Sequence, residues 1–283
     1  MQTALNHMTV PNLDYMKFLD LASDLGCSGV EVRNDINRTL FDDIEPREAG
    51  HIASDKGLRI FGLSQVYPFN DWSRHREDAV KSLIEIAKDS GAETISLIPL
   101  NNGQVFETGK RRSNLLSALE GVLLLLKDAD MVGLVEPLGF QRSSLRSKTE
   151  LVEMITSIGG NEHLRIVHDT FHHTLADGGP IYPEMTGIVH ISGVSDYKLG
   201  FMQMEDEHRV LVDTNDRIGN VEQIGALLGA GFIGPISFEC FSPEIHNLTN
   251  PLTEIKKSFD YISTPHDASR DRKRCMGQGL CNI

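Results

Sequence analysis

The segment RIVHD (residues 165–169) is a short apolar run, rich in branched residues, that ends in a carboxylate. Its length suits one buried strand, and a segment of helical period begins soon after it, near Phe171. The same alternation of short apolar runs and longer helical segments recurs along the chain. This pattern is typical of repeated β-α units around a parallel sheet.

Eight such runs predict eight strands, at residues 3–6, 29–33, 59–63, 94–97, 134–136, 165–168, 188–191 and 236–239. Barrels of eight β-α units often reach ~250 residues as one domain. We therefore predict an α/β fold, a (β/α)₈ TIM barrel, that forms a single domain over residues 1–263. The pattern stops after Ile262, and residues 264–283 are expected to form a flexible C-terminal tail.

Glycines and small polar residues mark the expected helix ends. A left-handed C-cap before the next strand is predicted at Gly26, Gly91, Gly133 and Gly231. Side chains that suit a helix N-cap are Asn12, Ser73 and Ser113.

The composition points to a small-molecule partner. The formal net charge is −13, whereas proteins that bind nucleic acid usually carry a basic face, so no nucleic-acid partner is expected. The longest apolar run, residues 122–126, is far too short to cross a bilayer, so no membrane span is expected.

The cysteines and the N-terminus favour a cytoplasmic protein. The sequence has neither paired CxxC spacing nor the cysteine density of a disulfide scaffold, and no basic and apolar signal region begins the chain. Cys275 and Cys281 could form a redox or metal pair in the tail, but a frayed terminus is the better interpretation, because no second ligand pair accompanies them.

Charged residues end four consecutive predicted strands. They are Glu136, Asp169, His190 and Glu239. In a closed parallel barrel the carboxyl ends of all strands meet at one rim, so these side chains should lie together. Three carboxylates and one imidazole suit one divalent cation, namely Mn²⁺, Mg²⁺, Co²⁺ or Zn²⁺.

Each of these residues also has an ordinary structural interpretation. Glu136 could be a solvated loop charge, His190 a hydrogen-bonded core histidine, and Asp169 an N-cap for the following helix. Glu239 is harder to explain in this way, because it follows the apolar run Ile236-Ser237-Phe238, where an unpaired carboxylate is costly. Taken together, the four residues favour a metal site.

Further polar residues are expected at the same rim. His172 lies one helical turn beyond Asp169 and could touch a substrate hydroxyl, whereas His173 is expected at the surface. Trp72 ends an aromatic loop that could cover the C–H face of a sugar-like ring; ordinary loop packing is the alternative. Hydrogen bonds around a polyol are expected from Asn6, His7, Glu31, Arg33, Gln65 and Arg142.

At these residues the chain resembles the xylose-isomerase-like barrel superfamily of sugar isomerases and epimerases, with the keto-inositol isomerases as the most similar group. The resemblance covers nearly the whole barrel. It is most specific at residues 135–139 (VEPLG), 168–172 (HDTFH) and 189–191 (VHI), and continues through 199–210 and 237–244.

The resemblance implies roles for single residues. Glu136, Asp169, His190 and Glu239 match the metal ligands, His172 matches a substrate-binding histidine, and Arg209 matches an arginine that faces the site. One departure is clear: a Pro-Gly-x-Gly turn usually follows that arginine, whereas residues 212–217 read VDTNDR here. The loop after Arg209 is therefore expected to be reshaped.

The implied activity is a metal-dependent isomerisation of an inosose or related keto-sugar through an enediol, with Glu136 and Glu239 as the catalytic carboxylates. A ketose 3-epimerase or an inosose dehydratase would use the same intermediate. A metal-dependent DNA-repair nuclease is disfavoured by the acidic charge, and a non-catalytic sugar-binding barrel by the intact ligand set. Assembly into a homo-oligomer is possible.

Overall fold

The computed structural model describes residues 1–104 and 107–264, and its strands close into a barrel. All neighbouring strands are parallel, and β1 pairs with β8 to close the ring. The predicted (β/α)₈ TIM barrel is therefore confirmed. The strands are β1 (Gln2–Asn6), β2 (Gly29–Arg33), β3 (Arg59–Val66), β4 (Thr94–Leu97), β5 (Val132–Val135), β6 (Leu164–Asp169), β7 (Thr186–Ile191) and β8 (Pro235–Phe238).

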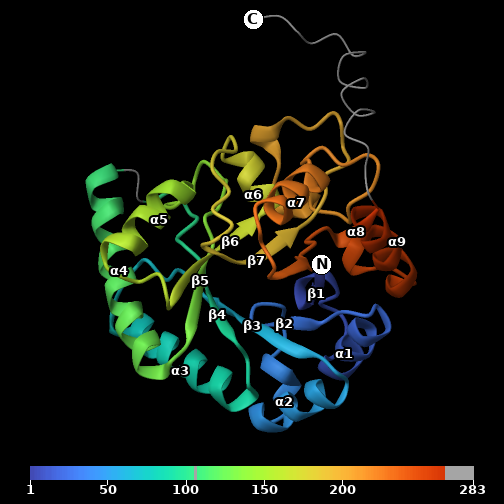
Figure 1. The fold of residues 1–283 in the computed structure, drawn as a ribbon, viewed down its shortest axis with the longest axis horizontal. Coiled ribbons are helices and arrows are strands. Elements are labelled where there is room, and N and C mark those ends of the chain that lie inside the picture. Colours follow the sequence, from blue (N-terminus) through green and yellow to red (C-terminus); the bar gives the residue numbers. More distant parts are fainter. Residues whose placement is uncertain (105–106, 265–283) are drawn as a thin grey trace, which may run out of the picture.

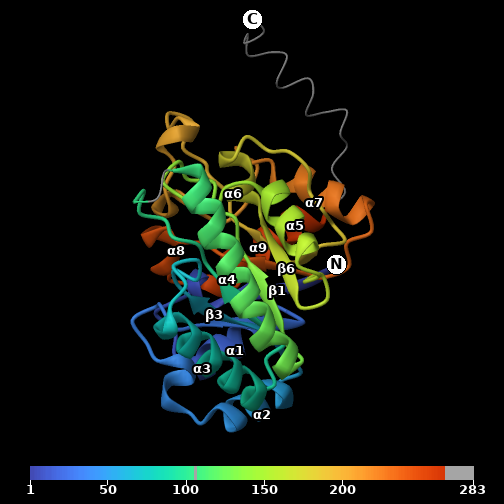
Figure 2. The ribbon, with the colours of Figure 1, turned by 90° about the vertical axis from the view of Figure 1, so that its left-hand side faces the viewer.

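Helices surround the strands as an outer ring (Figure 1). They are α1 (Tyr15–Asp24), α2 (Pro46–Asp55), α3 (Arg74–Ser90), α4 (Thr108–Ala129), α5 (Lys148–Ser157), α6 (Thr170–Leu175), α7 (Asn220–Gly229), α8 (Pro243–His246) and α9 (Pro251–Ser263). In the described residues the loops contain the short 3₁₀ segments η1 (His7–Thr9), η2 (Leu40–Asp43), η3 (Phe201–Gln203) and η4 (Asp206–His208). In Figure 2 the long helix α4 runs along the side of the barrel that faces the viewer.

The helix ends follow the predicted caps in part. Ser73 caps α3 as expected, because its side chain accepts a hydrogen bond from the Arg76 amide. The other two N-caps were predicted wrongly: α1 begins after Asp14 rather than Asn12, and α4 begins after Glu107 rather than Ser113. Asp14 also suits an N-cap by type, so side-chain type alone could not separate it from Asn12. Glu107 is not a usual N-cap residue, and it caps α4 because its carboxylate accepts hydrogen bonds from the Gly109 and Lys110 amides.

Three of the four predicted glycine caps have a left-handed backbone. Gly26, Gly91 and Gly231 have positive φ, but Gly133 lies inside β5. There an added Cβ would come within 2.8 Å of Leu126, so the glycine allows α4 to pack closely on the barrel. Asp130 takes the left-handed position at the end of α4 instead, with φ of 51°.

Alternation along the strands decides which side chains enter the barrel. Leu134, Val167 and Ile188 belong to a small apolar cluster separate from the main core between strands and helices. Side chains two residues apart in a strand share a face. Glu136, Asp169 and His190 each lie two residues beyond a member of this inner cluster, so they continue the inner face to the carboxyl rim.

Two further expectations concern membrane-spanning helices and the C-terminal tail. Within residues 1–104 and 107–264, no helix is long and apolar enough to cross a membrane. Residues 265–283 lie outside the described part, and so do Cys275 and Cys281. The division into a domain over residues 1–263 and a tail therefore stays a prediction.

Candidate active site

The four residues predicted as metal ligands lie together at the carboxyl rim. One ligand atom from each of Glu136, Asp169, His190 and Glu239 lies within 4.8 Å of the others, and all four residues are buried. Glu136 and Glu239 directly follow β5 and β8, while Asp169 and His190 lie at the ends of β6 and β7. The arrangement that could only be inferred from strand ends is thus a single cluster.

Two atoms of this cluster lack a hydrogen-bond partner in the described structure. They are Oε1 of Glu136 and Nδ1 of His190, both fully buried. An orphaned buried carboxylate oxygen is costly, and burial together with repulsion from Glu239 raises the pKa of Glu136. A divalent cation would satisfy both atoms, so the residues fit a mononuclear metal with oxygen and nitrogen ligands.

His190 is oriented by a carboxylate behind it. Its Nε2 lies 3.0 Å from Oε2 of Glu31 on β2, which leaves Nδ1 directed at Glu239, 3.3 Å away, and at Glu136, 3.7 Å away. Glu31 was expected to bind substrate, but it does not line the cavity and contacts the imidazole instead. A carboxylate on the far nitrogen of a metal-binding histidine selects the tautomer that can ligate.

Asn6 also lies behind the cluster rather than in contact with a substrate. It is fully buried, and its Nδ2 lies 3.3 Å from both Glu31 and Glu239. The expectation of a substrate contact is therefore corrected: Asn6 does not line the cavity, and its amide bridges two carboxylates.

Two arginines neutralise the acidic cluster. Arg209 donates from Nη2 to Asp169 at 2.5 Å and to Glu239 at 3.0 Å, while Arg33 donates to Glu239 at 2.5 Å and forms a two-point pair with Asp35. Burial opposes ionisation of Glu239, but His190, Arg33 and Arg209 outweigh it and hold its pKa well below the usual range. Burial likewise opposes ionisation of Asp169, and Arg209 lowers that pKa.

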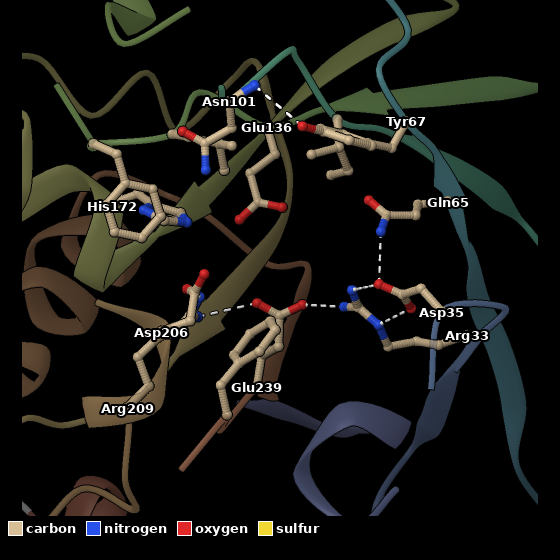
Figure 3. A pocket seen from close by; sticks show the side chains of 14 residues that line it. Arg33, Asp35, Gln65, Tyr67, Asn101, Glu136, His172, Asp206, Arg209 and Glu239 are labelled. Atoms are coloured by element: carbon tan, nitrogen blue, oxygen red, sulfur yellow. Dashed lines mark hydrogen bonds and ion pairs between the residues drawn. The ribbon is translucent and has the colours of Figure 1, made fainter. Parts of the chain in front are cut away.

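The cluster opens into a cavity of about 240 Å³. Figure 3 shows Glu136 pointing into it from one side, opposite Glu239 and its arginine partners. Its walls contain four of the predicted substrate-binding residues, His172, Arg209, Arg33 and Gln65. The remaining lining residues are Asp35, Tyr67, Ile98, Asn101, Glu136, Leu138, Phe140, Asp206, Glu239 and Phe241.

Trp72 does not line this cavity, so its predicted role is corrected. Its indole packs on Gly121 of α4 so closely that a Cβ there would come within 2.3 Å of the ring. The alternative interpretation, loop packing, holds for this residue. Tyr67, from the same aromatic loop, lines the cavity instead, and its hydroxyl accepts a hydrogen bond from the Asn101 amide at 3.4 Å.

Other lining residues escaped sequence reasoning. Asp35 lies two residues beyond β2, Asn101 lies four residues beyond β4, and Asp206 begins the 3₁₀ segment η4. His173 was expected at the surface, but it is buried and lies 3.1 Å from Nζ of Lys148. Because α6 lies against the barrel, even its second histidine is covered.

The unusual loop after Arg209 stays away from the cavity, since none of residues 212–217 lines it. Asp216 instead accepts hydrogen bonds from the amides of Ile218 and Asn220, so the loop holds the start of α7.

Comparisons with known proteins agree with the barrel fold. The family model of xylose isomerase-like TIM barrels matches residues 19–282. A search of curated proteins found no match. Among solved structures, a xylose isomerase domain containing protein from Salmonella typhimurium LT2 is 29% identical with a TM-score of 0.83, over 92% of this chain and 94% of the other.

Two further solved structures show the same fold at lower identity. IolI protein with a binding zinc atom is 18% identical with a TM-score of 0.81, over 93% of this chain and 100% of the other. D-psicose 3-epimerase with D-tagatose, from Clostridium cellulolyticum H10, is 15% identical with a TM-score of 0.71, over 93% and 98%.

Proposed function

We propose that the chain, which belongs to the family of xylose isomerase-like TIM barrels, is a metal-dependent isomerase that interconverts keto-inositols by proton transfer through an enediol. The observation that carries this proposal is the position of Glu136 and Glu239. Both carboxylates belong to the four-residue cluster and both line the cavity, from opposite sides. A substrate bound between them has an acid-base group on each face.

Glu136, Asp169, His190 and Glu239 would hold the cation. When bound, a divalent cation supplies a Lewis acid that polarises the substrate carbonyl and acidifies the adjacent C–H bond. One glutamate then takes the proton from that carbon, and the other, directly or through the enediol oxygens, completes delivery to the former carbonyl carbon. A positioned carboxylate typically contributes ~10² to 10⁴ in rate.

The rest of the cavity wall suits a small polyol. Its volume of about 240 Å³ lies below the ~300–1,000 Å³ of pockets for drug-sized ligands. Gln65, Asn101 and His172 offer hydrogen-bonding groups for hydroxyls, and Phe140 and Phe241 offer apolar surface for C–H groups. Asp206 adds an acceptor beside Arg209.

The charges favour an uncharged substrate. Among the described residues that line the cavity, the cations are Arg33 and Arg209, and both are bonded to carboxylates. Four carboxylates line the same cavity: Asp35, Glu136, Asp206 and Glu239. A bound divalent cation would bring the positive charge level with these four carboxylates, so the cavity would hold no surplus positive charge to attract a substrate carboxylate, and an uncharged inosose or ketose suits it.

A panel assay tests the proposal. Purified protein supplied with Mn²⁺ is incubated with inososes and ketohexoses, and the products are identified by NMR. Conversion of an inosose to an isomeric inosose is expected. Glu239→Gln should slow it by ~10² to 10⁴, whereas the matched control Glu93→Gln, an exposed glutamate paired with Arg59, should be unaffected. Turnover of ketohexoses alone would reject the keto-inositol substrate and favour a ketose 3-epimerase.

A further inference from the structure

A second cavity, of about 160 Å³, adjoins the first. His172 lines both. The second cavity lies where the start of α5 meets α6, and its polar walls come from Arg146, Ser147, Lys148, Thr149, His172 and His173. None of its lining residues is acidic, although the chain carries a net charge of −13. This local basic character needs an explanation.

Lys148 is a buried lysine whose partners are both neutral rings. Its Nζ donates to Nδ1 of His168 at 2.8 Å and to Nδ1 of His173 at 3.1 Å. Nε2 of His168 lies 2.9 Å from Oε1 of Gln223, so it carries the ring proton and Nδ1 is an acceptor. Burial and the nearby ammonium lower the pKa of His173 to about 4, so this ring is an acceptor too. In the described part of the chain, no carboxylate lies within ion-pair distance of Lys148.

Such an ammonium is incompletely satisfied. It has three N–H donors, and the two imidazoles accept two of them. Burying a cation without a counter-ion is costly. Accordingly, burial lowers the pKa of Lys148 to about 7, although Asp169 and Glu136 act in the opposite direction. The remaining donor and the missing counter-charge both favour an anionic ligand.

Arg146 repeats this pattern on the other wall. Its Nε donates to the Gly139 carbonyl and its Nη2 to the Leu175 carbonyl, each at 2.9 Å. In the described residues it forms no salt bridge. Between the two cations begins α5, a helix of ten residues in which the Lys148 and Thr149 amides belong to the first turn. Amides of a first turn have no acceptor within their own helix.

We propose that this second cavity binds a tetrahedral oxyanion, either free phosphate or the phosphoryl group of a small phosphate ester. Lys148 and Arg146 would supply the counter-charge, and the first-turn amides of α5 would supply hydrogen bonds. The proposal does not depend on the isomerase activity, because none of the four metal-ligand candidates lines this cavity. His172 would be the shared wall through which the bound anion touches the substrate cavity.

Titration calorimetry tests the proposal. Inorganic phosphate is titrated into the full-length protein in slightly acidic chloride buffer, in which the lysine is protonated. We expect saturable one-to-one binding. Lys148→Met keeps the length of the side chain and removes the charge, and Arg146→Gln removes the second cation; each should weaken phosphate binding by about tenfold or more. Lys256→Met, on the exposed side of α9, is the matched control and should bind phosphate as the parent does.

Two further experiments distinguish free phosphate from a phosphate ester, and the second cavity from the first. A hexose 6-phosphate that binds more tightly than inorganic phosphate, and loses this binding in Lys148→Met, would identify a phosphate ester; weaker binding would identify the free anion. Phosphate binding that is absent, that survives Lys148→Met and Arg146→Gln unchanged, or that disappears only in Arg33→Gln would overturn the proposal. The last result would assign the anion to the first cavity.

Discussion

Glu31 Oε2 lies 3.0 Å from Nε2 of His190, on the side of the imidazole opposite the ligand cluster. Both side chains are almost completely buried, so the contact is shielded from water. It requires a proton on Nε2 and leaves Nδ1, an atom without a hydrogen-bond partner in the described structure, free to ligate. The carboxylate thus orients the imidazole that would hold the cation, without itself lining the cavity.

Removing the Glu31 side chain should therefore weaken metal binding. We expect Glu31→Ala to lower the affinity for Mn²⁺ by about 10- to 100-fold, as is common for partners behind a metal ligand. Glu31→Gln keeps an acceptor for the Nε2 proton and should recover part of the loss. Calorimetric titration with metal measures both, and circular dichroism checks that each variant is folded. Equal affinity in Glu31→Ala and the parent would contradict this role.

Metal removal should abolish turnover. No lysine lines the first cavity in the described residues, and its two arginines, Arg33 and Arg209, are bonded to carboxylates, so we expect the cation to be needed to polarise the carbonyl. Dialysis against a chelator should remove activity, and Mn²⁺, Co²⁺ or Zn²⁺ should restore it, as followed by product formation and by metal analysis. Undiminished turnover by metal-free protein would reject the mechanism.

Proton transfer through the glutamates predicts solvent exchange. A hydrogen that passes through Glu136 or Glu239 becomes a carboxylic-acid proton and can exchange with water, so product formed in D₂O should carry deuterium on carbon. A hydride shift between carbons would leave it unlabelled. Glu239→Gln should lower kcat by ~10² to 10⁴ and change KM much less. Metal content must be measured in parallel, because the same residue belongs to the ligand cluster.

The buried lysine predicts a pH-dependent stability. The pKa of Lys148 falls from 10.5 to about 7 in the folded protein, chiefly because burial disfavours the charge. Between these values the unfolded chain binds the extra proton, so the folded state gains stability as the pH rises, by up to about 1.4 kcal/mol per pH unit. Below pH 7 the lysine is charged in both the folded and the unfolded state, so the folded protein keeps the full cost of burying that charge.

Urea unfolding across that pH range measures this effect, with phosphate left out of the buffer. The free energy of unfolding of the parent should rise relative to that of Lys148→Met as the pH increases from 7 to 9. A difference between the two proteins that stays constant over this range would mean that the lysine is not held at a lowered pKa.

The sequence predicted the barrel and the ligand cluster because both follow from short-range regularities. Alternation within a strand determines that Glu136 shares a face with Leu134, and barrel closure brings the strand ends together. What could not be predicted depends on loops and on contacts between distant segments. Asp35 reaches the cavity from the loop after β2, and Asp206 reaches it from the short segment η4. Trp72 turns toward α4 because a glycine there leaves room for the indole.

The sequence also could not show how deeply each side chain of the rim lies in the barrel. Sequence pattern assigns Asn6, Glu31 and His190 to one rim but does not say which of them faces a ligand and which lies behind. Their order is decided by hydrogen bonds among three strands: the Asn6 amide lies 3.3 Å from Glu31, and Glu31 lies 3.0 Å from His190. Likewise, His173 is buried through its contact with Lys148, a residue 25 positions earlier in the chain.

The close packing of Trp72 on Gly121 connects the outside of the barrel to a loop that lines its cavity. The segment that carries this indole also carries Tyr67 in the cavity wall and Asn70, which bonds to Ser144 and to the Leu100 amide. A methyl group at position 121 would have to displace the indole, and with it the anchorage of this loop. Gly121 lies on an outer helix and bears no functional group, yet substitutions there are constrained because they would shift a loop that shapes the cavity. We therefore expect a screen for altered substrate preference to return variants at Gly121, a position that the catalytic chemistry alone does not point to.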